Sequence, residues 1–225
     1  MIHDTGRVKR RRLRREWKRS GTVGLLDVLA FRVWYQLTRR RQEHAWRERV
    51  LAELCSRYPD LPANVPTIHV GTPNSPEAQA FVRDAAPDVM LALCKYILKP
   101  AVFTAARVGT FVLHPGICPE YRNAHGCFWA IVHDDDRVGM TLLRIDEGID
   151  TGPIYGYFTH PHDLSRQSHI VIQNSMTFEN LDAIGERISE VCGGGATPMT
   201  VQGRASAMWG QPRLTPYLAW RWRHR

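Results

Sequence analysis

Apolar residues recur at intervals of three and four between Val23 and about Tyr58, which is the pattern of amphipathic helices. The set comprises Leu25, Leu26, Leu29, Val33, Leu37, Trp46, Val50, Leu51 and Leu54. The arginines Arg39–Arg41 interrupt this pattern. We therefore expect one or two helices here, with a break near these arginines.

Short apolar runs alternate with helical patterns in the next part of the chain. Ser75 followed by Pro76 predicts an N-cap and the start of a helix over 76–85. The run 87–94 is mostly apolar, which is typical of a strand buried on both faces of a parallel sheet. Further segments are expected to be a strand at 65–70, a short helix at 101–108 and a strand at Thr110–Leu113. This β-α-β-α-β order predicts a parallel α/β sheet.

The stretch from Phe111 to Ile154 carries the candidate chemistry. The strand before His114 is followed by a loop rich in Pro and Gly, a short apolar helix at Cys127–Val132 and a strand at Val138–Ile145. An acidic turn, DEGIDTG, then holds Asp146, Glu147 and Asp150. Strands that end at a histidine and an aspartate can bring both side chains to one sheet edge, where open α/β sheets bind their ligands.

The last part of the chain predicts one more strand and a long helix. The strand follows Ile154, and the helix is expected over Ser165–Val191, ending at the glycines 193–195. The tail after residue 195 ends in an aromatic and basic sequence, which is expected either to pack or to fray. We expect a basic arm at 1–21, a main domain at 22–195 and a C-terminal extension at 196–225.

Composition and charge restrict the class of protein. A length of 225 residues with 44% hydrophobic content fits one globular domain. No run approaches the roughly 18 apolar residues of a membrane span, and no signal-peptide core follows the basic N-terminus. The five cysteines lack C-x-x-C spacing, so we expect free thiols in a reducing cytoplasm.

The net charge of +8 is concentrated at one end of the chain. Residues 1–50 hold 15 of the 30 basic residues and five of the 22 acidic ones, a balance of 15 − 5 = +10. The remaining residues carry 15 − 17 = −2. The basic segment is either a solvated arm or a contact for nucleic acid, anionic lipid or an acidic partner.

Residues 87–154 resemble the folate-dependent formyltransferases, a family that includes glycinamide ribonucleotide, methionyl-tRNA and sugar N-formyltransferases. The family's ordered motif N-x-H-P, P-x-Y-R, W-A-I, G-x-T and D-x-G-x-I is matched at every specified position except its first asparagine. The matching residues are His114, Pro115, Pro119, Tyr121, Arg122, Trp129, Ala130, Ile131, Gly139, Thr141, Asp150, Gly152 and Ile154.

The resemblance implies a Rossmann-like, open and mostly parallel sheet, in which the first strand–helix–strand unit has no obvious counterpart. It implies transfer of a formyl group from 10-formyltetrahydrofolate to an amine of a small molecule or a sugar nucleotide. His114 would donate a hydrogen bond to the oxyanion. Asp150 would orient the His114 ring and take part in proton relay. The pterin would contact a set of residues on two loops: Tyr96, Ile97, Leu98, Arg144, Asp146 and Gly148.

Val112 departs from this pattern, because the family has its catalytic asparagine two residues before the histidine. Loss of one oxyanion donor costs roughly 10²–10³ in rate. Three alternatives follow. Asn123 or His125 in the adjacent loop substitutes for the missing donor, the acceptor or reaction has changed, or catalysis is lost and the chain only binds folate or a partner protein.

The remaining expectations concern partners. The 30 residues after position 195 are too few for the C-terminal barrel of methionyl-tRNA formyltransferases, which disfavours tRNA as the substrate. Nucleic acid remains an alternative partner for the arm, and a homodimer is compatible with the sequence. His160 and His162 have no third ligand nearby in the sequence, so we expect no metal site.

Overall fold

The computed structural model describes residues 6–163 and 167–224, with side chains from residue 13 onward. Its helices are α1 (Gly6–Thr38), α2 (Arg40–Arg57), α3 (Pro76–Ala85), α4 (Pro100–Phe103), α5 (Gly126–Val132), α6 (His169–Phe178), α7 (Leu181–Cys192) and α8 (Leu214–Arg223). Its strands are β1 (Val89–Ala92), β2 (Gly109–His114), β3 (Arg122–Asn123), β4 (Met140–Arg144), β5 (Ile154–Phe158) and β6 (Met208–Trp209).

The central sheet has the strand order β1-β2-β4-β5. β1 and β2 are parallel, whereas β4 runs antiparallel to both β2 and β5. The α/β class and the open, formyltransferase-type sheet are as expected, while the pairing among these four strands is mixed. Residues 6–57 form α1 and α2, so the described part of the chain has no strand before β1.

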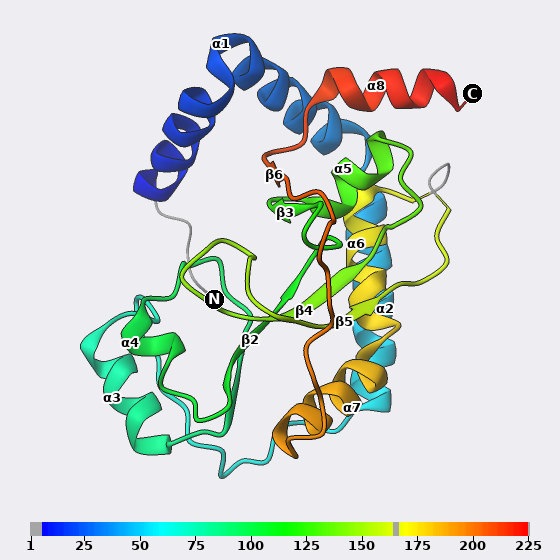
Figure 1. Ribbon diagram of the computed structural model, residues 1–225. Helices are drawn as coiled ribbons and strands as arrows, with labels where there is room; N and C mark the ends of the chain where they lie inside the picture. The colour runs from blue at the N-terminus through cyan, green and yellow to red at the C-terminus, as the bar shows by residue number, and fades with distance from the viewer. Residues whose placement is uncertain (1–5, 164–166, 225) are drawn as a thin grey trace.

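The two faces of the sheet are covered differently. Helices α1, α5, α6 and α8 gather over one face, as Figure 1 shows, and their side chains form the main core with alternate residues of β2 and β4. This core includes Phe31, Phe111, Phe128, Leu142 and Trp220, each at most 5% exposed. The opposite face carries a smaller cluster of Cys118, Leu143 and Ile154, with Val112 and Val201 packed against it.

The C-terminal extension packs across this second face rather than fraying. The backbone N–H of Met199 donates to the Ile154 carbonyl at 2.7 Å, and that of Ala207 donates to the Pro119 carbonyl at 3.1 Å. Figure 1 shows the segment crossing the sheet before it reaches α8. The Arg204 guanidinium pairs with the Glu120 carboxylate at 2.6 Å, which holds the crossing segment in place.

Several predicted elements are confirmed. The helix break falls at Arg39, between α1 and α2. Helix α3 begins at Pro76, and the Ser75 hydroxyl accepts from the Ala78 N–H at 3.3 Å as an N-cap. The strand before His114 and the helix at Cys127–Val132 are also found, as β2 and α5.

Three expected elements are wrong or shorter than predicted. Residues 65–70 are not a strand: Pro66 lacks an N–H, and no described strand pairs with this exposed segment. β1 is an edge strand rather than one buried on both faces, since Leu91 is 40% exposed. The helix expected at 101–108 ends at Phe103.

The long helix expected over Ser165–Val191 is divided into α6 and α7. The Asn180 side-chain amide donates to the Thr159 and Met176 carbonyls, which ends α6 and lets the chain turn. Residues 164–166 lie outside the described part of this prediction. The arm expected at 1–21 is helical from Gly6, with a kink at Gly21 (φ 69°), and residues 1–5 lie outside the described chain.

Candidate active site

His114 and Asp150 lie together at the end of β2. His114 is the last residue of the strand and is 3% exposed. Its Nδ1 lies 3.3 Å from Oδ2 of Asp150, and its Nε2 lies 2.7 Å from the Tyr121 carbonyl oxygen. The Asp150 carboxylate and the Tyr121 carbonyl therefore hold the imidazole ring at both of its nitrogens and fix its orientation.

The acidic turn places the Asp150 carboxylate through an unusual backbone conformation. Asp150 has φ 51°, in the left-handed region that aspartate and asparagine tolerate better than most residues. Its Oδ2 also accepts from the Asn123 backbone N–H at 2.8 Å. Within the turn, Oδ1 of Asp146 accepts from the Gly148 N–H at 2.9 Å and from the Thr151 hydroxyl at 2.8 Å. These bonds fix the turn that presents Asp150.

A cavity of about 590 Å³ opens beside this pair. The loop 96–98 and the acidic turn, through Asp146, Gly148 and Asp150, both line it. Val112, Leu143 and Phe103 supply apolar walls. The arrangement offers backbone groups and the acidic residues Asp146, Glu147 and Asp150 beside apolar walls, and small-molecule sites commonly combine apolar walls with a few polar groups.

Most of the residues expected to bind the cofactor line this cavity. Tyr96, Ile97 and Leu98 line it from the loop, and Asp146 and Gly148 line it from the acidic turn. Arg144 is not among the lining residues. Its carbonyl lies directly under Gly152, where an added Cβ would be 1.7 Å from the oxygen, so the backbone of Arg144 supports the turn from behind.

The two loop residues considered as substitute donors point elsewhere. The Asn123 side-chain amide donates to the Trp209 carbonyl, outside the cavity, and its backbone N–H donates to Asp150. The His125 ring lies 6.0 Å from the His169 ring, on the side of α1 and α6. Neither residue lines the cavity, and the wall position two residues before His114 is Val112.

His125 and His169 form a second, buried histidine pair. Burial lowers the pKa of His125 to about 4, and the nearby charges of Arg32 and Lys95 lower it further. Burial also holds the pKa of His169 well below its ordinary value, with His125 contributing. Nδ1 of His125 is buried without a protein partner. Both rings are therefore neutral near pH 7.

Asn74 is a positioning residue that the sequence did not reveal. Its side-chain amide donates to the Ile97 carbonyl at 2.9 Å, and its side-chain oxygen accepts from the Lys99 N–H at 2.7 Å. The Tyr96 hydroxyl donates to the Gly71 carbonyl at 3.2 Å. The segment 71–74 thus holds the loop that lines the cavity. An asparagine in a loop carries no signal of a contact 23 residues away.

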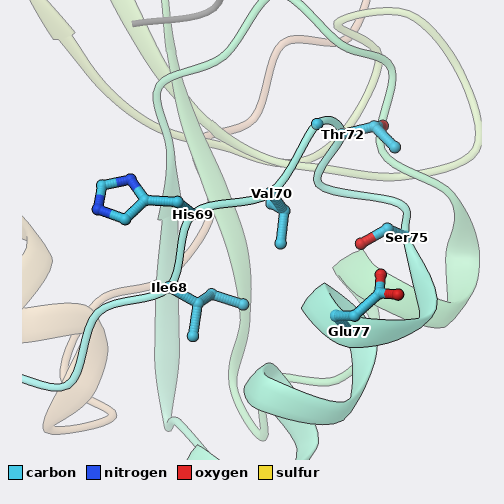
Figure 2. Close-up of a pocket in the computed structure, with 7 residues that line it drawn as sticks. Ile68, His69, Val70, Thr72, Ser75 and Glu77 are labelled. Atoms are coloured by element: carbon cyan, nitrogen blue, oxygen red, sulfur yellow. The ribbon is translucent and has the colours of Figure 1, made fainter.

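A second, more open hollow of about 410 Å³ lies over residues 68–77. Figure 2 shows Ser75 and Glu77 at the start of α3, with His69 pointing away from them. The pKa of Glu77 is lowered by its own backbone N–H at the helix start and by Ser75. The helix N-terminus is thus already occupied by a carboxylate and a cap, which disfavours anion binding there.

Comparison with known proteins places these features in a family. Residues 46–178 match the family model described as formyl transferase, which is more than half of the chain. The fold is that of an open α/β sheet, and the chain belongs to the formyltransferase family.

The relatives and solved structures match only parts of their own length. The methionyl-tRNA formyltransferase of Sorangium cellulosum (strain So ce56) is 41% identical over 96 residues, which is 42% of this chain and 31% of that protein. That of Chlorobium chlorochromatii (strain CaD3) is 36% identical over 94 residues, 42% of this chain and 30% of that protein. This chain thus spans about a third of the length of these curated relatives.

The fold similarity is seen in a sugar N-formyltransferase from Shewanella sp. FDAARGOS_354. The TM-score is 0.51 at 18% identity, over 60% of this chain and 53% of that one. At this identity the likeness concerns the fold. None of the described helices is long and apolar enough to cross a bilayer.

Proposed function

We propose that this protein transfers a formyl group from 10-formyltetrahydrofolate to an amine. The observation that carries the proposal is the His114–Asp150 pair, with 3.3 Å between Nδ1 and Oδ2, beside the 590 Å³ cavity. Family membership supports the same chemistry. The loop 96–98 and the turn at Asp146–Gly148 would hold the pterin, largely through backbone groups.

Asp150 and His114 have different roles in the proposed reaction. In formyl transfer the amine nitrogen bonds to the formyl carbon, the bond from that carbon to the folate nitrogen breaks, and one proton passes from the amine to that nitrogen. Asp150 lines the cavity and can accept the amine proton. The His114 ring is bonded to Asp150 from outside the cavity lining, and its role is to orient that carboxylate and to donate to the negative charge that develops on the formyl oxygen.

A second candidate function is binding without efficient catalysis. Val112 provides no donor at the cavity wall, and the Asn123 amide is held by the Trp209 carbonyl. His114 is also engaged at both ring nitrogens, so it must release one partner before it can bond an oxyanion directly. These observations favour a homologue that binds a folate or a partner protein.

The acceptor is proposed as a small-molecule amine or a sugar nucleotide. The relatives matched in sequence are methionyl-tRNA formyltransferases, but the match covers about a third of their length. The fold neighbour is a sugar N-formyltransferase. A reducing cytoplasm suits the free thiols of the five cysteines, and a homodimer remains part of the proposal.

The test is an assay of tetrahydrofolate release with amino-sugar nucleotides and charged methionyl-tRNA as acceptors. We expect turnover with an amino-sugar nucleotide, and a loss of about 10²–10⁴ in kcat for His114→Ala and Asp150→Asn. Asn tolerates the left-handed backbone of position 150, so this variant removes the charge and keeps the turn. His44→Ala, at an exposed histidine on α2, is the control. Turnover that survives both variants would contradict the proposal.

A further inference from the structure

One face of α1 is apolar and exposed. Val23, Leu26, Val33 and Leu37 are 82%, 60%, 57% and 81% exposed. Together with Ala30 they are spaced by three and four residues, so they lie on one side of the helix over about four turns. Large apolar side chains gathered on one face in this way mark an interaction surface more often than isolated ones do.

The opposite side of α1, in the part after Gly21, is buried. Val28 and Phe31 are 1% and 4% exposed, and Phe31 packs into the main core. The charged residues between Thr22 and Thr38 are Asp27 and Arg32, and both are bonded to the C-terminal segment. Oδ1 of Asp27 accepts from the Thr215 N–H at 2.9 Å, and Arg32 donates to the Gln211 side chain at 3.1 Å. The exposed face therefore carries no charge of its own.

A basic segment with a tryptophan adjoins this face. The Trp17 indole N–H donates across the Gly21 kink to the Thr22 hydroxyl at 3.2 Å, and Trp17 is 53% exposed. Arg14, Arg15 and Lys18 flank it and are exposed. Figure 1 shows α1 bent over one end of the molecule, with α8 beside its second half. Trp17 thus lies between the basic residues 14–18 and the apolar face that begins at Val23.

We propose that the outer face of α1 docks on an anionic membrane surface, with the apolar side chains in the headgroup region and the basic ones against lipid phosphates. An interfacial helix combines an apolar face, an amphipathic aromatic ring and flanking Lys or Arg, and all three are present here. The balance of +10 in residues 1–50 complements a negative surface. Two other occupants of this face fit less well. A second copy of the chain would bring two basic segments together, and a nucleic acid would contact the basic side chains but not the apolar ones.

The experiment is co-sedimentation of the full chain with vesicles of phosphatidylcholine alone or mixed with phosphatidylglycerol. We expect binding at least about tenfold tighter to the anionic vesicles, from the basic charge near the surface. The double variant Leu26→Asp/Val33→Asp should weaken it about tenfold or more, and Arg14→Glu/Arg15→Glu/Lys18→Glu should abolish the lipid preference. Leu61→Asp, at an 82% exposed residue in the loop after α2, is the matched control and should bind like the wild type.

Circular dichroism and tryptophan fluorescence distinguish loss of membrane binding from loss of folding. Near-ultraviolet circular dichroism identifies any variant that fails to fold, and Trp17→Phe should remove a blue shift in fluorescence that anionic vesicles cause. Equal binding to both vesicle types, or equal loss in the Leu61→Asp control, would overturn the proposal. A lipid-free dimer that Leu26→Asp/Val33→Asp disrupts would assign the face to a second copy, and salt-sensitive RNA binding without vesicle binding would assign the arm to nucleic acid.

Discussion

Val112 is the residue on which the chemical interpretation depends most. It lies in the cavity wall on the same face of β2 as His114, where the resemblance places a catalytic asparagine. Replacing it by asparagine would restore a donor near the site of the developing oxyanion. The strand register pairs Val112 with Leu143 of β4. The Leu143 side chain has no hydrogen-bonding group, so it would not compete for the amide of an asparagine at position 112.

The first prediction is that Val112→Asn raises kcat for formyl transfer by about 10²–10³, because one oxyanion donor contributes that much. The measurement is kcat for tetrahydrofolate release, with KM for the folate expected to stay nearly constant. Val112→Leu serves as the control, since it adds volume without a donor. An unchanged kcat in a folded asparagine variant would mean that the missing donor does not limit the reaction.

The second prediction concerns the buried histidine pair. The pKa of His125 is about 4 in the folded protein against 6.5 ordinarily, so the unfolded chain binds more protons between these values. The stabilisation is fully present above about pH 6.5 and is lost as the pH falls toward 4. A shift of this size corresponds to about 3 kcal/mol of unfolding free energy.

Urea unfolding between pH 7 and pH 4 measures this loss. His125→Asn suits the left-handed φ of 54°, and His169→Phe suits a ring surrounded by Phe31 and Phe128, so the double variant should flatten the slope. The exposed His44→Asn is the control and should retain it. A slope that is equally steep in the double variant would show that other groups cause the acid sensitivity.

At the residue scale, the sequence predicted the histidine and the aspartate because each ends or follows a strand at one sheet edge. It did not predict where Asn123 and His125 point. Both have positive φ angles, 78° and 54°, which turn their side chains toward Trp209 and His169. Spacing along the chain carries no information on such local backbone reversals.

At the scale of elements, the acidic turn has the tightest backbone contact of the site. A Cβ on Gly152 would lie 1.7 Å from the Arg144 carbonyl oxygen, so any side chain must push the turn away from β4. Because the same turn lines the cavity through Asp146 and Gly148, its displacement changes the cavity wall directly.

The third prediction is therefore a matched pair of glycine substitutions. Gly152→Ala should cost about 1–3 kcal/mol of unfolding free energy and weaken folate binding. Gly185→Ala, in the exposed middle of α7 where nothing lies within 4 Å of the added Cβ, should stabilise the protein by about 0.5–1 kcal/mol. Thermal unfolding of both variants gives the comparison, and a Gly152→Ala protein as stable as wild type would refute the role of the close approach.

Elements with local signals were predicted best. The Ser75 cap, the Pro76 start and the helix break at Arg39 depend on residues next to each other in the sequence. The strand expected at 65–70 and the single helix expected over Ser165–Val191 were wrong. Whether such segments form depends on strand partners and on contacts with residues far away in the sequence. Residues 65–70 meet no described strand, and the Asn180 side chain ends α6 through bonds to distant and local carbonyls.

At the scale of the molecule, the C-terminal extension belongs to the core. Trp220 of α8 is 5% exposed, and Tyr217 lies 4.6 Å from Trp34 of α1 between ring centroids. The Trp129 indole N–H donates to the Gly210 carbonyl at 2.9 Å. An aromatic, basic ending in a sequence does not distinguish a packed helix from a frayed one, because its partners lie in α1 and α5.

The fourth prediction follows from this packing. Trp220→Ala should lower the unfolding free energy by about 3–5 kcal/mol, the usual effect of emptying a buried aromatic site. Leu218→Ala, on the same helix at a 47% exposed residue, should change it by less than about 1 kcal/mol. Urea titrations followed by circular dichroism measure both, and similar values for the two variants would mean that α8 does not support the core.

We propose above that the cavity lined by the loop 96–98 and the acidic turn binds a reduced folate. The most direct test is calorimetric titration of the wild-type protein with a stable 10-formyltetrahydrofolate analogue, repeated on Gly152→Ala and Gly185→Ala. We expect saturable binding at one site, weakened about tenfold or more by Gly152→Ala and unchanged by Gly185→Ala. Absence of binding by well-folded wild-type protein at millimolar analogue would contradict it.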